Sequence, residues 1–141
     1  MAGTRSRDKG KRGEREVKDI LVSAMQEVEN EIGTKGCSSA VKRNSTQSDG
    51  GGDDLLGIPL WSVEVKFQEK LNLGAWWKQA VEQNTDSLKS PCVIYRQSRR
   101  PWRVRLEMEM YDEFALADIT IDDFLRIFKA SYKWYLRRME R

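Results

Sequence analysis

The N-terminal part of the chain carries apolar residues with helical spacing. From Val17 onward these residues recur three or four positions apart. The spacing predicts a helix over residues 10–32, closed by Gly33, because glycine readily adopts the backbone conformation that ends a helix. Residues 1–8 lack this pattern and are rich in basic side chains, so we expect a disordered arm there.

A second helical pattern lies at the C-terminal end of the chain. Apolar residues between Ile121 and Met139 fall within roughly 120° on a helical wheel, which predicts a packed helix over residues 120–138. Ile127 and Trp134 lie outside this stripe. They predict a second contact surface on the same helix.

Shorter apolar runs between the two helices predict strands. In chain order, the predicted elements are a strand over 40–44, a hairpin of strands 54–56 and 60–67, a helix over 71–83, and strands over 91–96 and 102–106. A loop rich in Ser, Asp and Gly, residues 45–53, follows the first strand. This order predicts an α/β fold in which a mixed β-sheet is flanked by helices. Residues 9–141 are expected to form one domain, with a core over 9–106 and a C-terminal helical extension over 107–141.

The composition is that of one soluble domain. The chain has 141 residues, of which 39% are hydrophobic and 33% charged, which is enough apolar material for one core. Its longest apolar stretches are far shorter than the ~18 residues that a membrane helix needs, and the N-terminus is polar, so we expect neither a membrane anchor nor a secretory signal. We therefore expect a cytoplasmic protein without a membrane partner.

The residue types that are missing restrict the chemistry. The sequence has no histidine and only two cysteines, Cys37 and Cys92. Zinc sites built on His and Cys are excluded, as are serine or cysteine nucleophiles activated by histidine. An active site here must use carboxylates, Lys, Arg and a hard cation such as Mg²⁺, which prefers oxygen ligands. We expect both cysteines to be free thiols in a reducing compartment.

Charged residues are segregated along the chain, although the formal net charge is only +3. Residues 5–18 contain seven Lys or Arg against three acids, and residues 96–105 contain five Arg and no acid. Residues 107–123 contain seven acids and no base. The basic stretches can create a local field that attracts phosphate.

Two groups of charged side chains in the middle of the chain are candidates for chemistry. Glu64 and Lys66 lie two positions apart in the predicted strand 60–67, so both point to its polar face. In the predicted hairpin, one acid of the pair Asp53-Asp54 faces Glu64. A three-residue loop would pair Asp54 with Glu64, a two-residue loop would pair Asp53, and the spacing leaves both open. Two carboxylates so close repel each other unless a cation lies between them.

Glu14 in the first predicted helix adds another carboxylate. On a helical wheel it lies inside the apolar stripe that contains Ile20 and Met25, so it points toward the packed side of the helix. A carboxylate in this position either partners the helix N-terminus or belongs to a buried acidic site. The acids and Lys66 are thus either a polar sheet face with a stabilised helix end or a catalytic constellation.

An ordered set of short motifs makes the sequence recognisable. The motifs are Lys9-Gly10-Lys11-Arg12-Gly13-Glu14-Arg15-Glu16, Asp54-Leu55-Leu56-Gly57, Glu64-Val65-Lys66, Leu71-Asn72-Leu73, Gln79-Ala80 and Arg99-Arg100-Pro101-Trp102. Together they resemble the PD-(D/E)XK nuclease superfamily, specifically the archaeal-type Holliday junction resolvases and their phage-encoded relatives. The resemblance covers residues 9–106 and implies a restriction-endonuclease-like core to which the C-terminal helix is added.

The resemblance also implies a set of active-site residues. In chain order, the residues that match the family's motifs are Glu14, Asp54, Glu64, Lys66 and Gln79. Where the family often has proline before the motif aspartate, this sequence has Asp53. Asp53 therefore stays open as the alternative to Asp54 for binding metal.

The implied reaction is hydrolysis of DNA phosphodiester bonds with Mg²⁺, for which Mn²⁺ could substitute. Asp54, Glu64 and the backbone carbonyl of Val65 would hold the metal, and Lys66 would orient the attacking water. Glu14 would either bind a second metal through water or order the ligands of the first. No small-molecule cofactor is expected.

The implied substrate is branched DNA, cut at a Holliday junction by the paired symmetric nicks that a homodimer would make. Basic side chains then become candidates for contacts with the DNA backbone. They are Arg5, Arg7, Lys9, Lys11, Arg12, Arg96, Arg99 and Arg100. If phage-encoded, the protein is expected in the host cytoplasm. Two alternatives stay open: a related nuclease that nicks or trims other DNA, and a catalytically inactive DNA-binding module.

Overall fold

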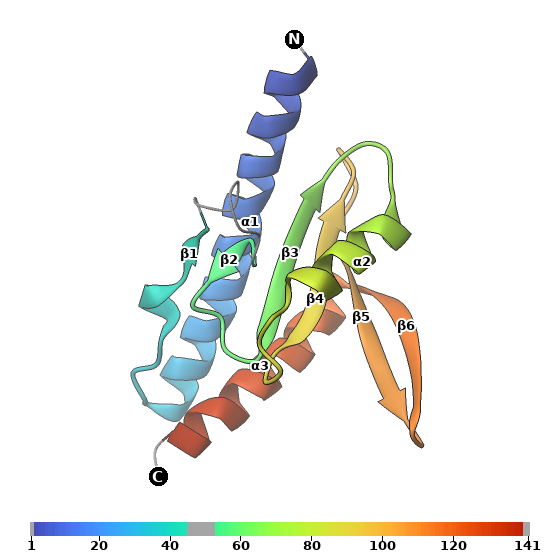
Figure 1. Ribbon diagram of the computed structural model, residues 1–141. Helices are drawn as coiled ribbons and strands as arrows, with labels where there is room; N and C mark the ends of the chain where they lie inside the picture. Colours follow the sequence, from blue (N-terminus) through green and yellow to red (C-terminus); the bar gives the residue numbers. More distant parts are fainter. Residues whose placement is uncertain (1, 45–52, 140–141) are drawn as a thin grey trace.

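The computed structural model describes residues 2–44 and 53–139, and in this part of the chain a mixed four-stranded sheet forms the centre of the fold (Figure 1). Side chains are described from residue 5 onward. The strands of the sheet are, in spatial order, β3 (Trp61–Phe67), β4 (Ser90–Arg96), β5 (Arg103–Met110) and β6 (Glu113–Thr120). β3 and β4 run parallel, whereas β5 and β6 continue the sheet antiparallel.

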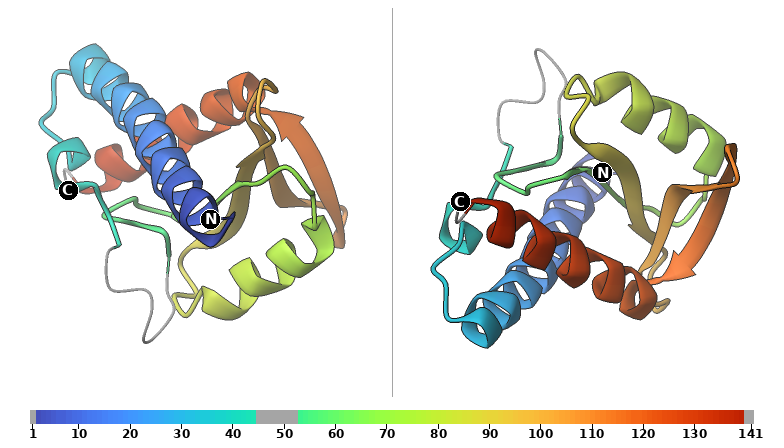
Figure 2. Two further views of the ribbon diagram at one scale, coloured as in Figure 1. Left: turned by 90° about the horizontal axis from the view of Figure 1, so that it is seen from above. Right: turned by 90° about the horizontal axis from the view of Figure 1, so that it is seen from below.

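Among the described residues, three α-helices cover the two faces of this sheet (Figure 2). The helices are α1 (Ala2–Ile32) and α3 (Ile121–Met139) on one face and α2 (Leu73–Gln83) on the other. A short 3₁₀ helix, η1 (Ser38–Ala40), and a two-stranded sheet of β1 (Lys42–Arg43) and β2 (Leu55–Leu56) lie beside α1. The predicted α/β fold with a mixed sheet flanked by helices is therefore confirmed.

The strand β3 lies between a large apolar cluster on one side and the layer of α2 on the other. On the side of α1 and α3, Val63 and Val65 join a large cluster that includes Phe124. On the side of α2, Trp76 and Tyr95 belong to a smaller cluster. Six of the seven residues of β3 are buried, so polar side chains such as Glu64 are held largely away from bulk water.

A hydrogen-bond network around Glu29 joins the C-terminal half of α1 to α3. Glu29 accepts hydrogen bonds from Tyr132 OH (2.6 Å) and Ser38 Oγ (2.7 Å). The Tyr132 oxygen in turn accepts one from the backbone N–H of Cys37 (2.9 Å). Because α1 is one continuous helix, this anchor also fixes the direction in which its N-terminal half passes the sheet.

The disordered arm predicted for residues 1–8 is wrong for Ala2–Asp8, which continue α1. Nucleation is the costly step of helix formation, so a helix whose later turns are packed extends easily into a polar segment without proline. Lys9 also anchors this part of the helix. Its Nζ pairs with Glu69 and lies 4.7 Å from the centroid of the Phe67 ring.

The hairpin predicted for residues 54–67 is wrong as a ladder of paired strands. β2 pairs with β1 and not with β3. The aspartate nevertheless lies against β3, because Asp54 N–H donates a hydrogen bond to Val63 O (2.9 Å). Gly57 and Leu60 both have positive φ, and they redirect the chain between β2 and β3.

The C-terminal extension predicted over 107–141 contains a strand as well as a helix. β5 runs on to Met110, and Tyr111 and Asp112, both with positive φ, form the turn into β6. The sequence has no Asn-Gly, Asp-Gly or similar pair at this turn, and such pairs are the strongest mark of a tight hairpin. α3 then confirms the predicted C-terminal helix.

The other predicted elements are confirmed with shifted ends. The strand predicted over 40–44 is reduced to β1, preceded by η1, and the helix predicted over 71–83 begins at Leu73. The predicted loop over 45–53 lies outside the described residues except for Asp53. No described helix combines the length and apolar character that crossing a membrane would require.

α1 packs closely against the sheet at Gly13 but not at Gly10. A Cβ on Gly13 would lie 2.9 Å from Phe67 Cβ, whereas a Cβ on Gly10 would meet nothing within 4 Å. We expect Gly10→Ala to stabilise the protein by about 0.5–1 kcal/mol through helix propensity. Gly13→Ala should instead destabilise it by about 1 kcal/mol or more, because overpacking outweighs the same gain.

Urea unfolding followed by circular dichroism measures both free energies of unfolding. Gly10→Ala is the matched control, since it makes the same chemical change one helical turn earlier. Equal stabilisation by the two substitutions would contradict the close contact of α1 with β3 at Gly13.

Candidate active site

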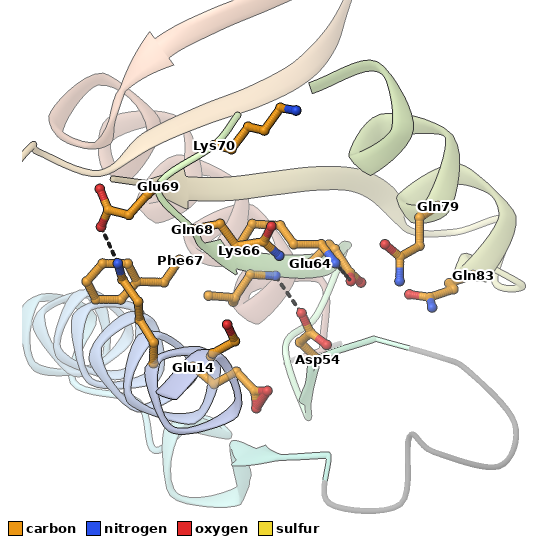
Figure 3. Close-up of a pocket in the computed structure, with 14 residues that line it drawn as sticks. Glu14, Asp54, Glu64, Lys66, Phe67, Gln68, Glu69, Lys70, Gln79 and Gln83 are labelled. Atoms are coloured by element: carbon orange, nitrogen blue, oxygen red, sulfur yellow. Dashed lines mark hydrogen bonds and ion pairs between the residues drawn. The ribbon is translucent and has the colours of Figure 1, made fainter. Parts of the chain in front are cut away.

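A cavity of about 650 Å³ opens between the N-terminal half of α1, β3 and α2 (Figure 3). All five residues predicted to form the active site line it: Glu14, Asp54, Glu64, Lys66 and Gln79. They come from α1, from the residue just before β2, from β3 and from α2. The fold therefore gathers in one place the side chains that the sequence motifs single out.

β3 carries Glu64 and Lys66 into the cavity. Glu64 is only 4% exposed, and its Oε1 lies 3.5 Å from Lys66 Nζ. Val63 and Val65, which alternate with these residues, are buried in the apolar cluster on the opposite face. The alternation of strand residues thus places a carboxylate and an ammonium together in a poorly solvated part of the cavity.

Asp54 is fixed beside β3 by its own backbone and side chain. Its N–H donates to Val63 O at 2.9 Å, and its Oδ2 accepts a hydrogen bond from Val65 N–H at 2.6 Å. The side chain is buried and lines the cavity together with Glu64. The aspartate is therefore held in place before any ligand binds.

Asp53 occupies a different environment. Its carboxylate accepts a hydrogen bond from Ser62 Oγ and lies 3.4 Å from Lys89 Nζ. Asp53 is not among the residues that line the cavity. Of the two aspartates that the spacing left open, the structure places Asp54 in the cavity and Asp53 in a contact with the segment that leads into β4.

Glu14 enters the cavity from α1, on the packed side of the helix as its wheel position predicts. Its Oε2 lies 3.3 Å from Arg43 Nε on β1. Partial burial, followed by the negative charge of Asp54, raises the pKa of Glu14, whereas Arg43 opposes this effect. Arg43 was not predicted, because only the tertiary fold brings β1 to this point of α1.

Burial also affects the ionisation of Glu64 in the cavity. Burial, followed by the nearby Asp54 carboxylate, raises the pKa of Glu64 to about 8, against the opposing effect of Lys66. Two carboxylates therefore share a poorly solvated site, in which the Lys66 ammonium lies close to Glu64. A cation bound near both carboxylates would favour their ionised forms.

The donor atoms suit a hard divalent cation. Asp54 and Glu64 supply two buried carboxylates, and Val65 also lines the cavity. Within the described residues, no group of three or more acidic or cysteine side chains is arranged to hold a metal ion. Mg²⁺ commonly takes only one or two protein carboxylates and keeps several waters, so the pair present here meets its requirements.

α2 lines the cavity with two glutamines. Gln79 is the predicted one, and Gln83, one helical turn later, also lines the cavity (Figure 3). Residues four apart lie on the same face of a helix, so the position of Gln83 follows from that of Gln79. This spacing in the sequence could have identified Gln83 as a further candidate.

Charged residues that directly follow β3 also border the cavity. Glu69 and Lys70 line it, and Glu69 pairs with Lys9 from α1. Glu69 also accepts a hydrogen bond from the backbone N–H of Ser98 in the β4–β5 turn (3.1 Å). This carboxylate therefore connects α1, the end of β3 and the β4–β5 turn at one end of the cavity.

The residues predicted to contact DNA divide into two groups. Arg96 is paired internally, because its Nη1 lies 3.3 Å from Glu16 Oε2 and its guanidinium lies 4.4 Å from the centroid of the Phe67 ring. Arg96 therefore ties β4 to α1, and Lys9 is paired with Glu69. The side chains of the remaining candidates are exposed: Arg5, Arg7, Lys11, Arg12, Arg99 and Arg100. The two basic stretches of the sequence, residues 5–18 and 96–105, therefore come together at the end of the cavity where Glu69 lies.

The sequence and the fold are similar to those of known proteins. A family model described as "Phage putative PDDEXK endonuclease" matches residues 5–141. No curated protein matches the sequence. Among solved structures, the fold is similar to that of Hjc from Archaeoglobus fulgidus, a Holliday junction resolvase from an archaeal hyperthermophile. That match has a TM-score of 0.42 and 16% sequence identity, and it covers 62% of this chain and 85% of that chain.

The family match spans nearly the whole chain, so the chain belongs to this family of phage PD-(D/E)XK endonucleases. The predicted relationship to PD-(D/E)XK nucleases is confirmed, and the protein is an endonuclease of this type. The added C-terminal strand and helix lie inside the matched region.

The raised pKa of Glu64 predicts how stability depends on pH in the metal-free protein. Between the ordinary pKa of 4.5 and about 8, Glu64 binds a proton in the folded chain but not in the unfolded chain. The free energy of unfolding should therefore fall as pH rises through this window, by up to about 1.4 kcal/mol per pH unit. Glu64→Gln keeps the shape without the charge and should flatten this dependence.

Urea unfolding in EDTA at several pH values between 5 and 8 measures the effect. Glu82→Gln, an exposed acid on α2, is the control that should keep the wild-type dependence. A Glu64→Gln protein with the same pH dependence as the wild type would contradict the burial of an ionisable Glu64.

Proposed function

We propose that this protein is a divalent-cation-dependent endonuclease that cuts branched DNA at the cavity of Asp54, Glu64 and Lys66. The observation that carries the proposal is the convergence of these residues with Glu14 and Gln79 around one cavity. A domain whose only task was to bind DNA would have no reason to bury carboxylates where phosphate must come close.

Asp54 and Glu64, with the backbone carbonyl of Val65, would hold Mg²⁺ or Mn²⁺. The bound cation would lower the pKa of a coordinated water and neutralise charge on the scissile phosphate. Asp54 needs no rearrangement for this task, because Val65 N–H already holds its carboxylate at 2.6 Å. Glu14 would bind a second cation through water or order the ligands of the first.

Lys66 is the side chain of the cavity best suited to interact with the reacting phosphate. Its contact with Glu64 at 3.5 Å holds the ammonium beside the carboxylates. From there it would donate hydrogen bonds to a phosphate oxygen or to the attacking water as negative charge develops. Gln79 and Gln83 would orient water or phosphate through their amide groups.

The exposed basic residues would position the DNA backbone. Arg5, Arg7, Lys11 and Arg12 lie on the N-terminal half of α1, and Arg99 and Arg100 lie in the β4–β5 turn. Contacts of this kind fix the register of DNA but do not read its sequence. They would guide the backbone into the cavity at the end where both basic stretches meet.

Four-way junctions are the substrate that the sequence motifs over residues 9–106 support. Resolving such a junction needs two symmetric incisions, so we propose a homodimer with twofold symmetry. A phage nuclease with this task would act on DNA in the cytoplasm of the host cell.

Substitutions in the cavity test the proposed chemistry. We expect Asp54→Asn and Lys66→Ala each to lower the cleavage rate at least about 100-fold, because the first weakens a ligand of the cation and the second removes the ammonium beside the reacting phosphate. Asp53→Asn is the matched control and should retain most activity, since Asp53 contacts Ser62 and Lys89 outside the cavity. Cleavage of labelled DNA in Mg²⁺, in Mn²⁺ and in EDTA measures these rates.

A thermal shift on adding Mg²⁺, present in the wild type and lost in Asp54→Asn, provides a readout that does not need cleavage. Activity that persists in EDTA would contradict the cation dependence. An equal loss in Asp53→Asn and Asp54→Asn would contradict the placement of the two aspartates.

The substrate is tested separately. A labelled four-way junction should receive paired nicks in opposing strands, and a linear duplex of matched sequence should be cut at least about tenfold more slowly. Equal cutting of both would keep the chemistry and reject junction specificity. Binding of junctions without any cutting would favour a catalytically inactive binding module.

A further inference from the structure

The far end of the β5–β6 hairpin exposes large apolar side chains. They are Met108, Met110, Tyr111, Phe114 and Leu116, which are between 46% and 92% exposed. The register pairs Met108 with Ala115 and Glu109 with Phe114, so apolar side chains emerge on both faces of the hairpin. Clusters of exposed apolar side chains mark surfaces that bind other molecules.

The same part of the hairpin is acidic. Glu107, Glu109, Asp112 and Glu113 lie on it, and within the described part of the chain none of them forms an ion pair with a basic side chain. Four such negative charges repel the DNA backbone. The partner of this surface must therefore combine apolar side chains with positive charge.

The outward face of α3 has this complementary chemistry. Trp134 and Ile127, which lie outside the packed stripe of the helix, are 51% and 41% exposed. The guanidinium of Arg138 lies 4.4 Å from the centroid of the Trp134 ring. Lys133, Trp134, Arg137 and Arg138 border a surface cavity of about 520 Å³. This face therefore offers an apolar centre with a basic rim.

We propose that two copies of this chain pair through these surfaces, with the acidic hairpin end of one copy packed on the basic outward face of α3 of the other. Each copy carries both surfaces, so in a twofold-symmetric dimer the contact forms twice. The apolar side chains of the hairpin end cover Trp134. The acids beside them meet Arg137 and Arg138, which sets the register and excludes pairing of two like surfaces.

This arrangement leaves the active-site cavity open. The residues proposed for the interface are not among those that line the cavity. Figure 1 shows the hairpin end at the opposite end of the molecule from the N-terminal half of α1. The inference rests on the homodimer of the proposed function and names the surfaces that form it, but it does not depend on the cleavage chemistry.

Charge reversal with rescue tests the interface in the full chain. Sedimentation equilibrium should find a dimer in the micromolar range, and Glu109→Lys with Glu113→Lys should weaken it at least about tenfold. Arg137→Glu with Arg138→Glu should weaken it equally. The four substitutions together should restore the dimer, because the charges are exchanged between the same two surfaces.

The controls separate this interface from other causes. Lys35→Glu with Lys78→Glu reverses two exposed charges outside both surfaces and should leave the dimer unchanged. Asp54→Asn should also dimerise as the wild type does, so loss of cleavage and loss of pairing are distinguishable. Circular dichroism checks that each variant is folded.

Three outcomes would overturn the proposal. The first is a wild-type monomer across the micromolar range. The second is a dimer that neither double reversal weakens more than the control, or that the combined variant fails to restore. The third is a double variant, Arg137→Glu with Arg138→Glu, that remains a dimer but binds DNA more weakly than the wild type. This result would show that the α3 face binds nucleic acid.

Discussion

The burial of Asp54 and Glu64 next to each other is the constraint on which the site depends. Burying two carboxylates side by side is costly, because both lose water and each repels the other. The fold offsets part of this cost with the Val65 N–H donated to Asp54 and the Lys66 ammonium beside Glu64. Two apolar side chains would fill the same space at a lower cost in folding free energy. Buried carboxylates that repel each other are expected where function and not stability determines the residues. In this site the effect is visible in the pKa of Glu64, which is raised to about 8.

The helix α1 determines whether this pair becomes a complete site. It brings Glu14 to the cavity, and it does so because Gly13 allows the helix to approach Phe67 closely. Glu16, three residues after Gly13, accepts hydrogen bonds from Trp102 Nε1 (3.2 Å) and from Arg96 (3.3 Å). The close packing at Gly13 and the hydrogen bonds of Glu16 thus both hold α1 against the sheet. A helix held at these points presents its N-terminal basic residues in a fixed direction along the cavity.

Sequence patterns were sufficient for the local part of the structure and insufficient where distant segments meet. The alternation of β3 places Glu64 and Lys66 on one face, and the wheel position of Glu14 points it inward. The choice between Asp53 and Asp54 depends on contacts with β3 and with the segment before β4, which no spacing reveals. β6 was missed for a different reason, since its turn is built from Tyr and Asp in place of the usual glycine pairs.

The segregation of charge along the sequence becomes a segregation in space. Glu69 connects the two basic stretches at one end of the cavity, through Lys9 on α1 and Ser98 in the β4–β5 turn. Four of the seven acids in residues 107–123 lie at the end of the β5–β6 hairpin, away from the residues that would hold DNA (Figure 1), whereas Asp118 pairs with Arg105 and the last two lie in the first turn of α3. A uniform mixture of charges would give the same net charge of +3 but no such polarity. Despite the modest net charge, one end of the molecule is suited to phosphate and the other repels it. In the proposed function, this polarity would orient DNA toward the cavity and leave the hairpin for protein contacts.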